Sequence, residues 1–115
     1  MVVFLIFAGC KKNQAGGDSE ISGVVAHHSQ TIPNATVYIK YNAKEFPGKD
    51  SSVYDTSVKC DAEGFYTFKC YKGDYYLYAT GLDKSSPPDY VKGGAPVSIR
   101  KNEKVRADLA VTEAH

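Results

Sequence analysis

The sequence predicts an all-β sandwich, and three observations lead to that prediction. From residue 21 onward, short runs rich in Val, Ile, Tyr, Phe and Thr are separated by Gly, Pro, Asn and Asp clusters. These clusters recur about every eight to twelve residues, a spacing typical of sandwiches. No stretch shows the apolar periodicity of a helix, and several runs alternate between apolar and polar residues, as half-buried strands do.

Alternation assigns inward faces to individual runs. In residues 35–41 the apolar side chains fall on every second position, and the same holds for residues 75–79. Because neighbouring strand residues point to opposite faces, we expect one buried and one wet face in each run. The predicted inward side chains are Ala35, Val37, Ile39, Tyr75, Leu77 and Ala79.

Two hairpins are predicted from turn residues. The Asp-Ala-Glu-Gly turn at 61–64 separates residues 53–60 from residues 65–70, and Asp and Gly favour such turns. A carboxy-terminal hairpin is predicted from residues 96–111, with Val97, Ile99, Val105, Leu109 and Val111 packing inward and a bulge near Ala107.

The two longest irregular segments are expected at residues 42–52 and 83–94. Long loops on a rigid scaffold are frequent recognition sites, although both segments also suit plain crossovers.

The first ten residues, an apolar run ending in Phe-Ala-Gly-Cys, resemble a bacterial lipoprotein signal with its lipobox. The resemblance implies cleavage before Cys10, acylation of that cysteine and attachment to a membrane. The run is too short to cross a bilayer. The sequence lacks the usual basic segment before the run and has Phe7 where Leu is usual, so we expect that the true start lies upstream. A buried amino-terminal strand is the alternative.

These observations divide the chain into three parts: residues 1–9 as the signal segment, residues 10–20 as the lipidated cysteine with a flexible tether, and residues 21–113 as the sandwich. The tether is predicted from a polar, glycine-containing stretch without apolar periodicity. The formal net charge is +1 with scattered lysines, which argues against a nucleic-acid partner.

Four blocks of sequence together resemble the carboxypeptidase regulatory-like domain: Ser-Gly-Val-Val at 22–25, Ile-Pro-Asn-Ala-Thr-Val at 32–37, Asp-Ala-Glu-Gly-Phe-Tyr-Thr-Phe at 61–68 and Lys-Gly-Asp-Tyr-Tyr-Leu at 72–77. The resemblance implies a transthyretin-like (prealbumin-like), seven-stranded Greek-key sandwich. It implies little about function, because these blocks are turn and core positions that serve accessory, stabilising and adhesive modules.

Cys60 and Cys70 are expected to stay unpaired. If Cys60 pairs with Phe65 in the predicted hairpin, Cys70 lies about five residues further along, or roughly 16 Å, beyond the ~7 Å that a disulfide spans. Cys70 is then a small core residue, while Cys60 is less constrained. A bulge that allows the bridge remains an alternative.

No catalytic, metal or cofactor site is predicted. His27 and His28 are adjacent on a strand, so their side chains should point to opposite faces. The acidic turn at Asp61 and Glu63, with Asp55 nearby, offers too few oxygens for calcium. A purine-breakdown hydrolase shares the transthyretin-like fold, but its carboxy-terminal Tyr-Arg-Gly-Ser signature is absent here.

The chain has nine tyrosines and no tryptophan, a bias that first indicates sheet stabilisation and, as the second interpretation, a tyrosine-rich binding face. Alternation places Tyr38, Tyr76 and Tyr78 opposite the predicted core, and Tyr90 lies in a predicted loop. Outward tyrosines stack on sugars or anchor protein partners, but they also stabilise sheets through cross-strand pairs.

We therefore expect a non-enzymatic, lipid-anchored module of the bacterial cell envelope, on the outer membrane, in the periplasm or at the surface. Its partners would be the membrane, through lipid on Cys10, and an envelope protein or glycan. A structural spacer or assembly subunit is the alternative, and a small hydrolase is a third hypothesis.

Overall fold

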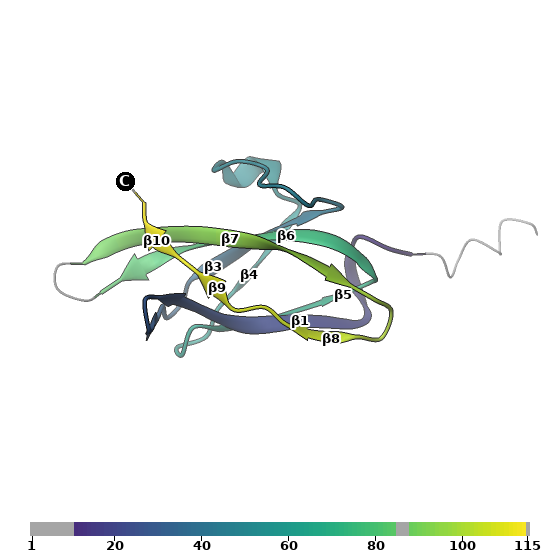
Figure 1. Cartoon of the computed structure of the whole chain (residues 1–115), viewed down its shortest axis with the longest axis horizontal. Helices are drawn as coiled ribbons and strands as arrows, with labels where there is room; N and C mark the ends of the chain where they lie inside the picture. Colours follow the sequence, from purple (N-terminus) through teal and green to yellow (C-terminus); the bar gives the residue numbers. More distant parts are fainter. Residues whose placement is uncertain (1–10, 85–87, 115) are drawn as a thin grey trace, which may run out of the picture.

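The computed structural model describes residues 11–84 and 88–114, and these residues form two β-sheets that face each other (Figure 1). Apart from a short 3₁₀ turn at Ser51–Val53, the regular elements in this part of the chain are strands. The strands are β1 (Ala15–His27), β2 (Gln30–Thr31), β3 (Thr36–Tyr41), β4 (Thr56–Lys59), β5 (Phe65–Cys70), β6 (Gly73–Asp83), β7 (Asp89–Ile99), β8 (Lys104–Arg106), β9 (Leu109–Ala110) and β10 (Thr112–Glu113).

The first sheet is built around β1. Strand β5 pairs antiparallel with it, and β2 folds back on its end through the two-residue loop of His28 and Ser29. The late strands β8 and β9 pair parallel with β1, joining Ile21 to Val105 and Val25 to Leu109. Both edges of β1 are therefore occupied, one of them by the end of the chain.

The second sheet has the order β10-β7-β6-β3-β4. Strands β6 and β7 form a long antiparallel hairpin from the pair Gly73 and Ile99 to the pair Asp83 and Asp89. Strand β3 lies between β6 and β4, with Tyr38 opposite Tyr78. These pairings confirm an all-β, two-sheet arrangement of the sandwich kind.

The core lies between the sheets and contains the inward side chains that alternation predicts. Val37, Ile39, Tyr75, Leu77 and Ala79 are fully buried, and Ala35 is nearly so. Val97, Ile99, Leu109 and Val111 are also buried, and Val105 packs against the cluster. From the other sheet β1 and β5 add the large side chains of Ile21, Val25, Tyr66 and Phe68.

Both predicted hairpins were wrong. The turn at residues 61–64 exists, because the Asp61 side chain accepts hydrogen bonds from the N–H groups of Glu63 and Phe65. Its flanking strands separate, however: β4 pairs with β3, whereas β5 pairs with β1. Likewise, after β7 the chain crosses to β1, where β8 and β9 pair, and only β10 returns to β7, far from the predicted turn. Each turn passes the chain from one sheet to the other.

Among the described residues, Cys60 and Cys70 remain free, as expected, and both are buried. The reason differs from the predicted hairpin register. Cys60 follows β4 in the second sheet, while Cys70 ends β5 in the first and lies opposite Ser19.

Two expected boundaries also change. Strand β1 begins at Ala15, so the prediction of a flexible tether through residue 20 was wrong from that point onward. Residues 89–94, expected in a loop, belong to β7. The signal segment and Cys10 lie outside the described residues.

Within residues 11–84 and 88–114, the structure has no helix that is long and apolar enough to span a membrane.

Candidate functional site

All four tyrosines singled out from the sequence lie on the outer face of the second sheet. Tyr38 on β3 and Tyr76 on β6 are half-buried, but Tyr78 is only 5% exposed. Tyr90, at the start of β7, is 70% exposed. The outer face is thus covered in one region and open in another.

The cover is the crossover at residues 42–55, which folds back over the sheet. Its Tyr54 ring stacks on Tyr78, with ring centres 5.7 Å apart and planes 7° from parallel. Its Phe46 ring lies 5.3 Å from Tyr78 and 5.9 Å from Tyr76. We call Tyr38, Phe46, Tyr54, Tyr76 and Tyr78 the outer aromatic cluster.

Burial within the outer aromatic cluster changes its chemistry. Loss of water contact, and then the neighbouring Tyr78 and Tyr76, raise the pKa of Tyr54 to about 12. The Tyr54 hydroxyl donates a hydrogen bond to the Gly48 carbonyl at 2.8 Å, which closes the crossover on itself. The rings of the outer aromatic cluster therefore pack against one another. The ring faces of Tyr78 are already covered by the crossover.

The open region is a hollow of about 370 Å³ beside the cluster. Tyr78 forms one wall and Tyr90 another, so the fold joins two of the four predicted tyrosines, while Tyr38 and Tyr76 do not line the hollow. Polar side chains, among them Thr36, Thr80 and Lys92, lie between the tyrosines. An aromatic surface next to several hydrogen-bonding groups suits a small polar ligand with a flat apolar face.

A second candidate site lies at the end of the sandwich where β1, β6 and β10 meet. His27 continues the inward alternation of β1 and is 8% exposed. Its Nδ1 lies 2.6 Å from Asp83 Oδ2, and its Nε2 lies 2.6 Å from Glu113 Oε2. The ring thus links three strands that are far apart in the sequence.

These two carboxylates set the protonation of His27. The pKa of His27 is raised, chiefly by its hydrogen bond to Asp83. Burial lowers the pKa of His27 in part, and the contact with Glu113 raises it further. The pKa of Glu113 is in turn lowered, first by its own backbone N–H and then by His27.

His28 lies beside His27, and the prediction that the two side chains point to opposite faces was wrong. His28 has a φ of 60° and occupies the two-residue loop between β1 and β2. Strand alternation ends there, and the two ring centres come within 4.3 Å of each other.

Together, His27, His28 and Glu113 form a group that can hold a metal ion. One ligand atom from each residue lies within 4.8 Å of the others. We call these three residues with Asp83 the histidine end of the molecule. Two clues were present in the sequence, adjacent histidines and a polar hairpin loop, but nothing in it brought Glu113 to them.

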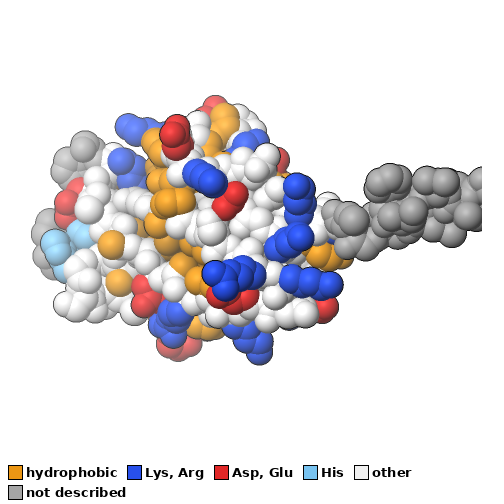
Figure 2. Space-filling view, turned by 45° about the vertical axis from the view of Figure 1, so that its right-hand side comes forward, with side chains coloured by type: hydrophobic (Ala, Val, Ile, Leu, Met, Phe, Trp, Pro, Cys, Tyr) orange, Lys and Arg blue, Asp and Glu red, His pale blue; other side chains and the backbone are white. Residues whose placement is uncertain are grey.

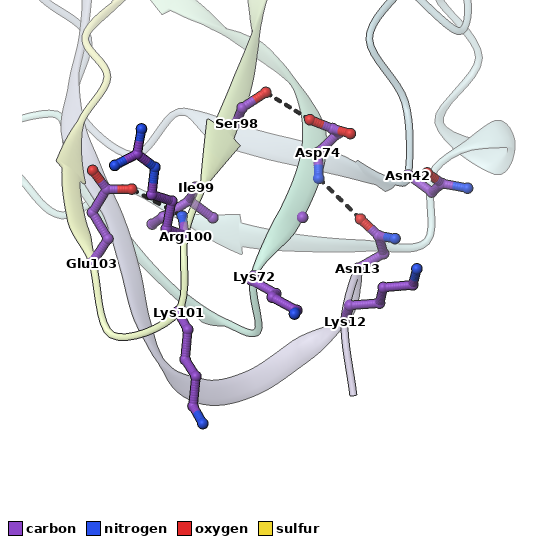
Figure 3. Close-up of a pocket in the computed structure, with 11 residues that line it drawn as sticks. Lys12, Asn13, Asn42, Lys72, Asp74, Ser98, Ile99, Arg100, Lys101 and Glu103 are labelled. Carbon is purple, nitrogen blue, oxygen red and sulfur yellow. Dashed lines mark hydrogen bonds between the residues drawn. The ribbon is translucent and has the colours of Figure 1, made fainter. Parts of the chain in front are cut away.

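The opposite end of the sandwich is basic. A hollow of about 650 Å³ is bordered by Lys12, Lys72, Arg100 and Lys101, as Figure 3 shows. The two acids in its wall are engaged: Asp74 accepts from the Ser98 hydroxyl, and Glu103 from the Arg100 N–H. We call this region the basic end. In Figure 2 blue side chains gather near the start of the described chain, and the pale-blue histidines lie at the far side.

Neither described cysteine has the properties of a nucleophile. Burial raises the pKa of Cys60 to about 11 and also raises the pKa of Cys70. A catalytic cysteine needs a lowered pKa and access to substrate.

No protein-family model matches this chain, and no curated protein matches it. The resemblance to a carboxypeptidase regulatory-like domain therefore stays a prediction.

Proposed function

We propose that the protein is a non-enzymatic, lipid-anchored module of the bacterial cell envelope that binds a glycan or a protein. The observation that carries the binding role is the hollow between Tyr78 and the exposed Tyr90. Tyr90 offers a flat apolar ring to a ligand, and the neighbouring threonines and Lys92 offer hydrogen bonds.

Attachment through Cys10 is supported by the position of the basic end. The Asn13 N–H donates to the Lys72 carbonyl at 2.8 Å, and Asn13 Oδ1 accepts from the Asp74 N–H at 2.9 Å. The folded domain thus binds the chain at Asn13, three positions after Cys10. Three extended residues span about 10 Å, the greatest distance that can separate Cys10 from Asn13. A lipid on Cys10 would hold the basic end against the bilayer, where each Lys or Arg gains about 1 kcal/mol from anionic headgroups.

The family proposal is a transthyretin-like, seven-stranded Greek key. Its support is the two-sheet arrangement, the Asp61 turn followed by inward Tyr66 and Phe68, and the return through Tyr75 and Leu77. The described part of the chain forms ten strands, of which β2, β9 and β10 are only two residues long.

A binding experiment tests the recognition role. The full chain with Cys10→Ser would be applied to a glycan array and used to capture envelope proteins, alongside Tyr90→Ala and Lys92→Ala. We expect both substitutions to weaken binding at least about tenfold, as truncations at the centre of a binding site do. Lys59→Ala, an exposed lysine on β4, is the matched control and should leave binding unchanged.

Absence of any ligand would favour the structural spacer, whereas binding that survives Tyr90→Ala would show that the hollow is not the binding site. Turnover of a substrate by the chain would favour the hydrolase.

A separate experiment tests the anchor. Intact mass of the protein extracted from membranes should show acylation at Cys10, and Cys10→Ser should release the protein from the membrane. An unmodified, membrane-bound Cys10→Ser chain would overturn the anchor. A fragment that begins at Ser19 would be unsuitable for these experiments, because the Gln14 carbonyl accepts hydrogen bonds from the Tyr71 N–H and the Tyr75 hydroxyl.

A further inference from the structure

The histidine end contains donor atoms that the proposed binding role does not use. His27 belongs to β1, His28 to the following loop, and Glu113 to β10. These residues contribute two imidazoles and one carboxylate, a donor set that suits zinc and similar transition ions. Calcium and magnesium are poorly served, because they need mostly oxygen ligands.

His27 is already oriented as a metal ligand. Its Nδ1 is held by the buried Asp83 carboxylate at 2.6 Å, which leaves Nε2 facing Glu113 and the surface. Metal-binding histidines almost always place a carboxylate or carbonyl on the second ring nitrogen. Asp83 is thus a positioning residue, and it acts through His27.

The spacing of the donors is close to that of a bound ion. The three ligand atoms lie within 4.8 Å of one another, whereas ligands of a tetrahedral zinc are about 3.3 Å apart. His27 and Glu113 are already closer than this, so His28 has most of the distance to cover. Glu113 has an exposed side chain and adjusts easily.

Charge and access also fit. Asp83 and Glu113 place two carboxylates beside the ring of His27, and a divalent cation is attracted to them. A hollow of about 490 Å³ opens at His27, His28 and Glu113, so an ion can enter and keep water as its fourth ligand.

We propose that His27, His28 and Glu113 bind one divalent transition ion of the zinc type, with Asp83 orienting His27. The ion joins β1 to β10 and so fastens the end of the described chain to the first sheet. This site is independent of the tyrosine-lined hollow and of the lipid anchor.

Titration of the full chain with Zn²⁺ by calorimetry tests the proposal. We expect one ion per chain, and at least about tenfold weaker binding for both His28→Asn and Glu113→Gln. Asn tolerates the positive φ of His28, and Glu113→Gln keeps the shape of the side chain. Thermal unfolding without metal should match the wild type for each variant, which shows that the fold is kept.

Two matched controls accompany these variants. His115→Gln replaces the chain's remaining histidine, and Glu45→Gln replaces an exposed acid on the crossover. Both should bind Zn²⁺ as the wild type does.

Cobalt gives a spectroscopic test of the ligands. Co²⁺ at the site should show visible bands of tetrahedral nitrogen and oxygen coordination, without the thiolate charge-transfer band that cysteine ligands produce. The proposal is overturned if Zn²⁺ does not bind, if binding survives His28→Asn and Glu113→Gln, if His115→Gln abolishes it, or if cobalt reports thiolate ligands.

Discussion

The two ends of the sandwich handle charge in opposite ways, although the same long strands β1, β6 and β7 connect them. At the histidine end, His27 and Asp83 turn inward and pair at 2.6 Å under cover of the sheets. At the basic end, Lys12, Lys72 and Lys101 come from separate segments around an open hollow. Inward charges must have partners because burial penalises an unpaired charge, whereas outward charges remain solvated.

The charges at the two ends therefore contribute to different properties: the stability of the fold at the histidine end, and the attraction of ligands or membranes at the basic end. A buried pair that loses one partner destabilises the fold, while exposed charges contribute little to stability and act on ligands or membranes instead. Substitutions at the two ends should therefore have different consequences.

The largest loss of stability is expected at the basic end, from the substitution of a glycine and not of a lysine. Gly73 has a φ of 148°, and a Cβ there would collide with Asn13 Oδ1. We expect Gly73→Ala to lower the free energy of unfolding by about 2–4 kcal/mol, through backbone strain and loss of the Asn13 contact. Urea unfolding followed by circular dichroism measures it.

Gly48→Ala is the matched control. Gly48 also has a positive φ, of 132°, but a Cβ there would have no neighbouring atom within 4 Å. Gly48→Ala should lower the free energy of unfolding by only about 1 kcal/mol, through backbone strain. Equal losses at both glycines would show that the Asn13 contact does not stabilise the fold.

The next effect is expected at the histidine end. Asp83→Ala removes the buried partner of His27 Nδ1 and should lower the thermal midpoint by roughly 5–10 °C. Asp83→Asn keeps an oxygen acceptor and should lose less. At the basic end Asp74→Ala removes only an exposed contact with Ser98 and should change the midpoint by about 2 °C or less.

The comparison between the ends fails if Asp74→Ala is as damaging as Asp83→Ala. It also fails if Asp83→Ala melts with the wild type.

The smallest difference between the two ends is expected in the reactivity of their thiols. Cys60 lies beyond β4, toward the histidine end, and Cys70 pairs with Ser19 near the basic end. Because burial raises the pKa of Cys60 to about 11, only about a thousandth of it is thiolate at pH 8. Iodoacetamide should modify neither Cys60 nor Cys70 in the folded protein and both of them in denaturant, as mass spectrometry would show.

The raised thiol pKa also predicts a pH dependence. The unfolded chain loses its thiol protons first as pH rises through the ordinary thiol range, so the stability of the fold should fall there. Rapid labelling of one cysteine at pH 8 without denaturant would show local opening at that end.

Much of the fold was predictable because the side-chain period of a strand is local. Alternation alone identified Val37, Ile39, Leu77 and Val97 as core residues, and they are buried. Which sheet a strand joins is not local information. The Asp61 turn has the residues of a hairpin turn. Strand β5, which follows it, nevertheless pairs with β1 and not with β4.

The candidate sites divide in the same way. Tyr90 was identified from composition, and it is exposed. The burial of Tyr78 depends on Tyr54 and Phe46 from a crossover whose path the sequence does not reveal. The histidine end depends on one positive φ at His28 and on the arrival of Glu113 from 86 residues away.

The parallel pairing of β1 with β8 and β9 has a consequence for biosynthesis. Residues 20–26 find these partners only in residues 104–110, which follow them by 84 positions in the chain. Contacts so distant in the chain form slowly, and the first sheet stays incomplete until residue 110 has left the ribosome.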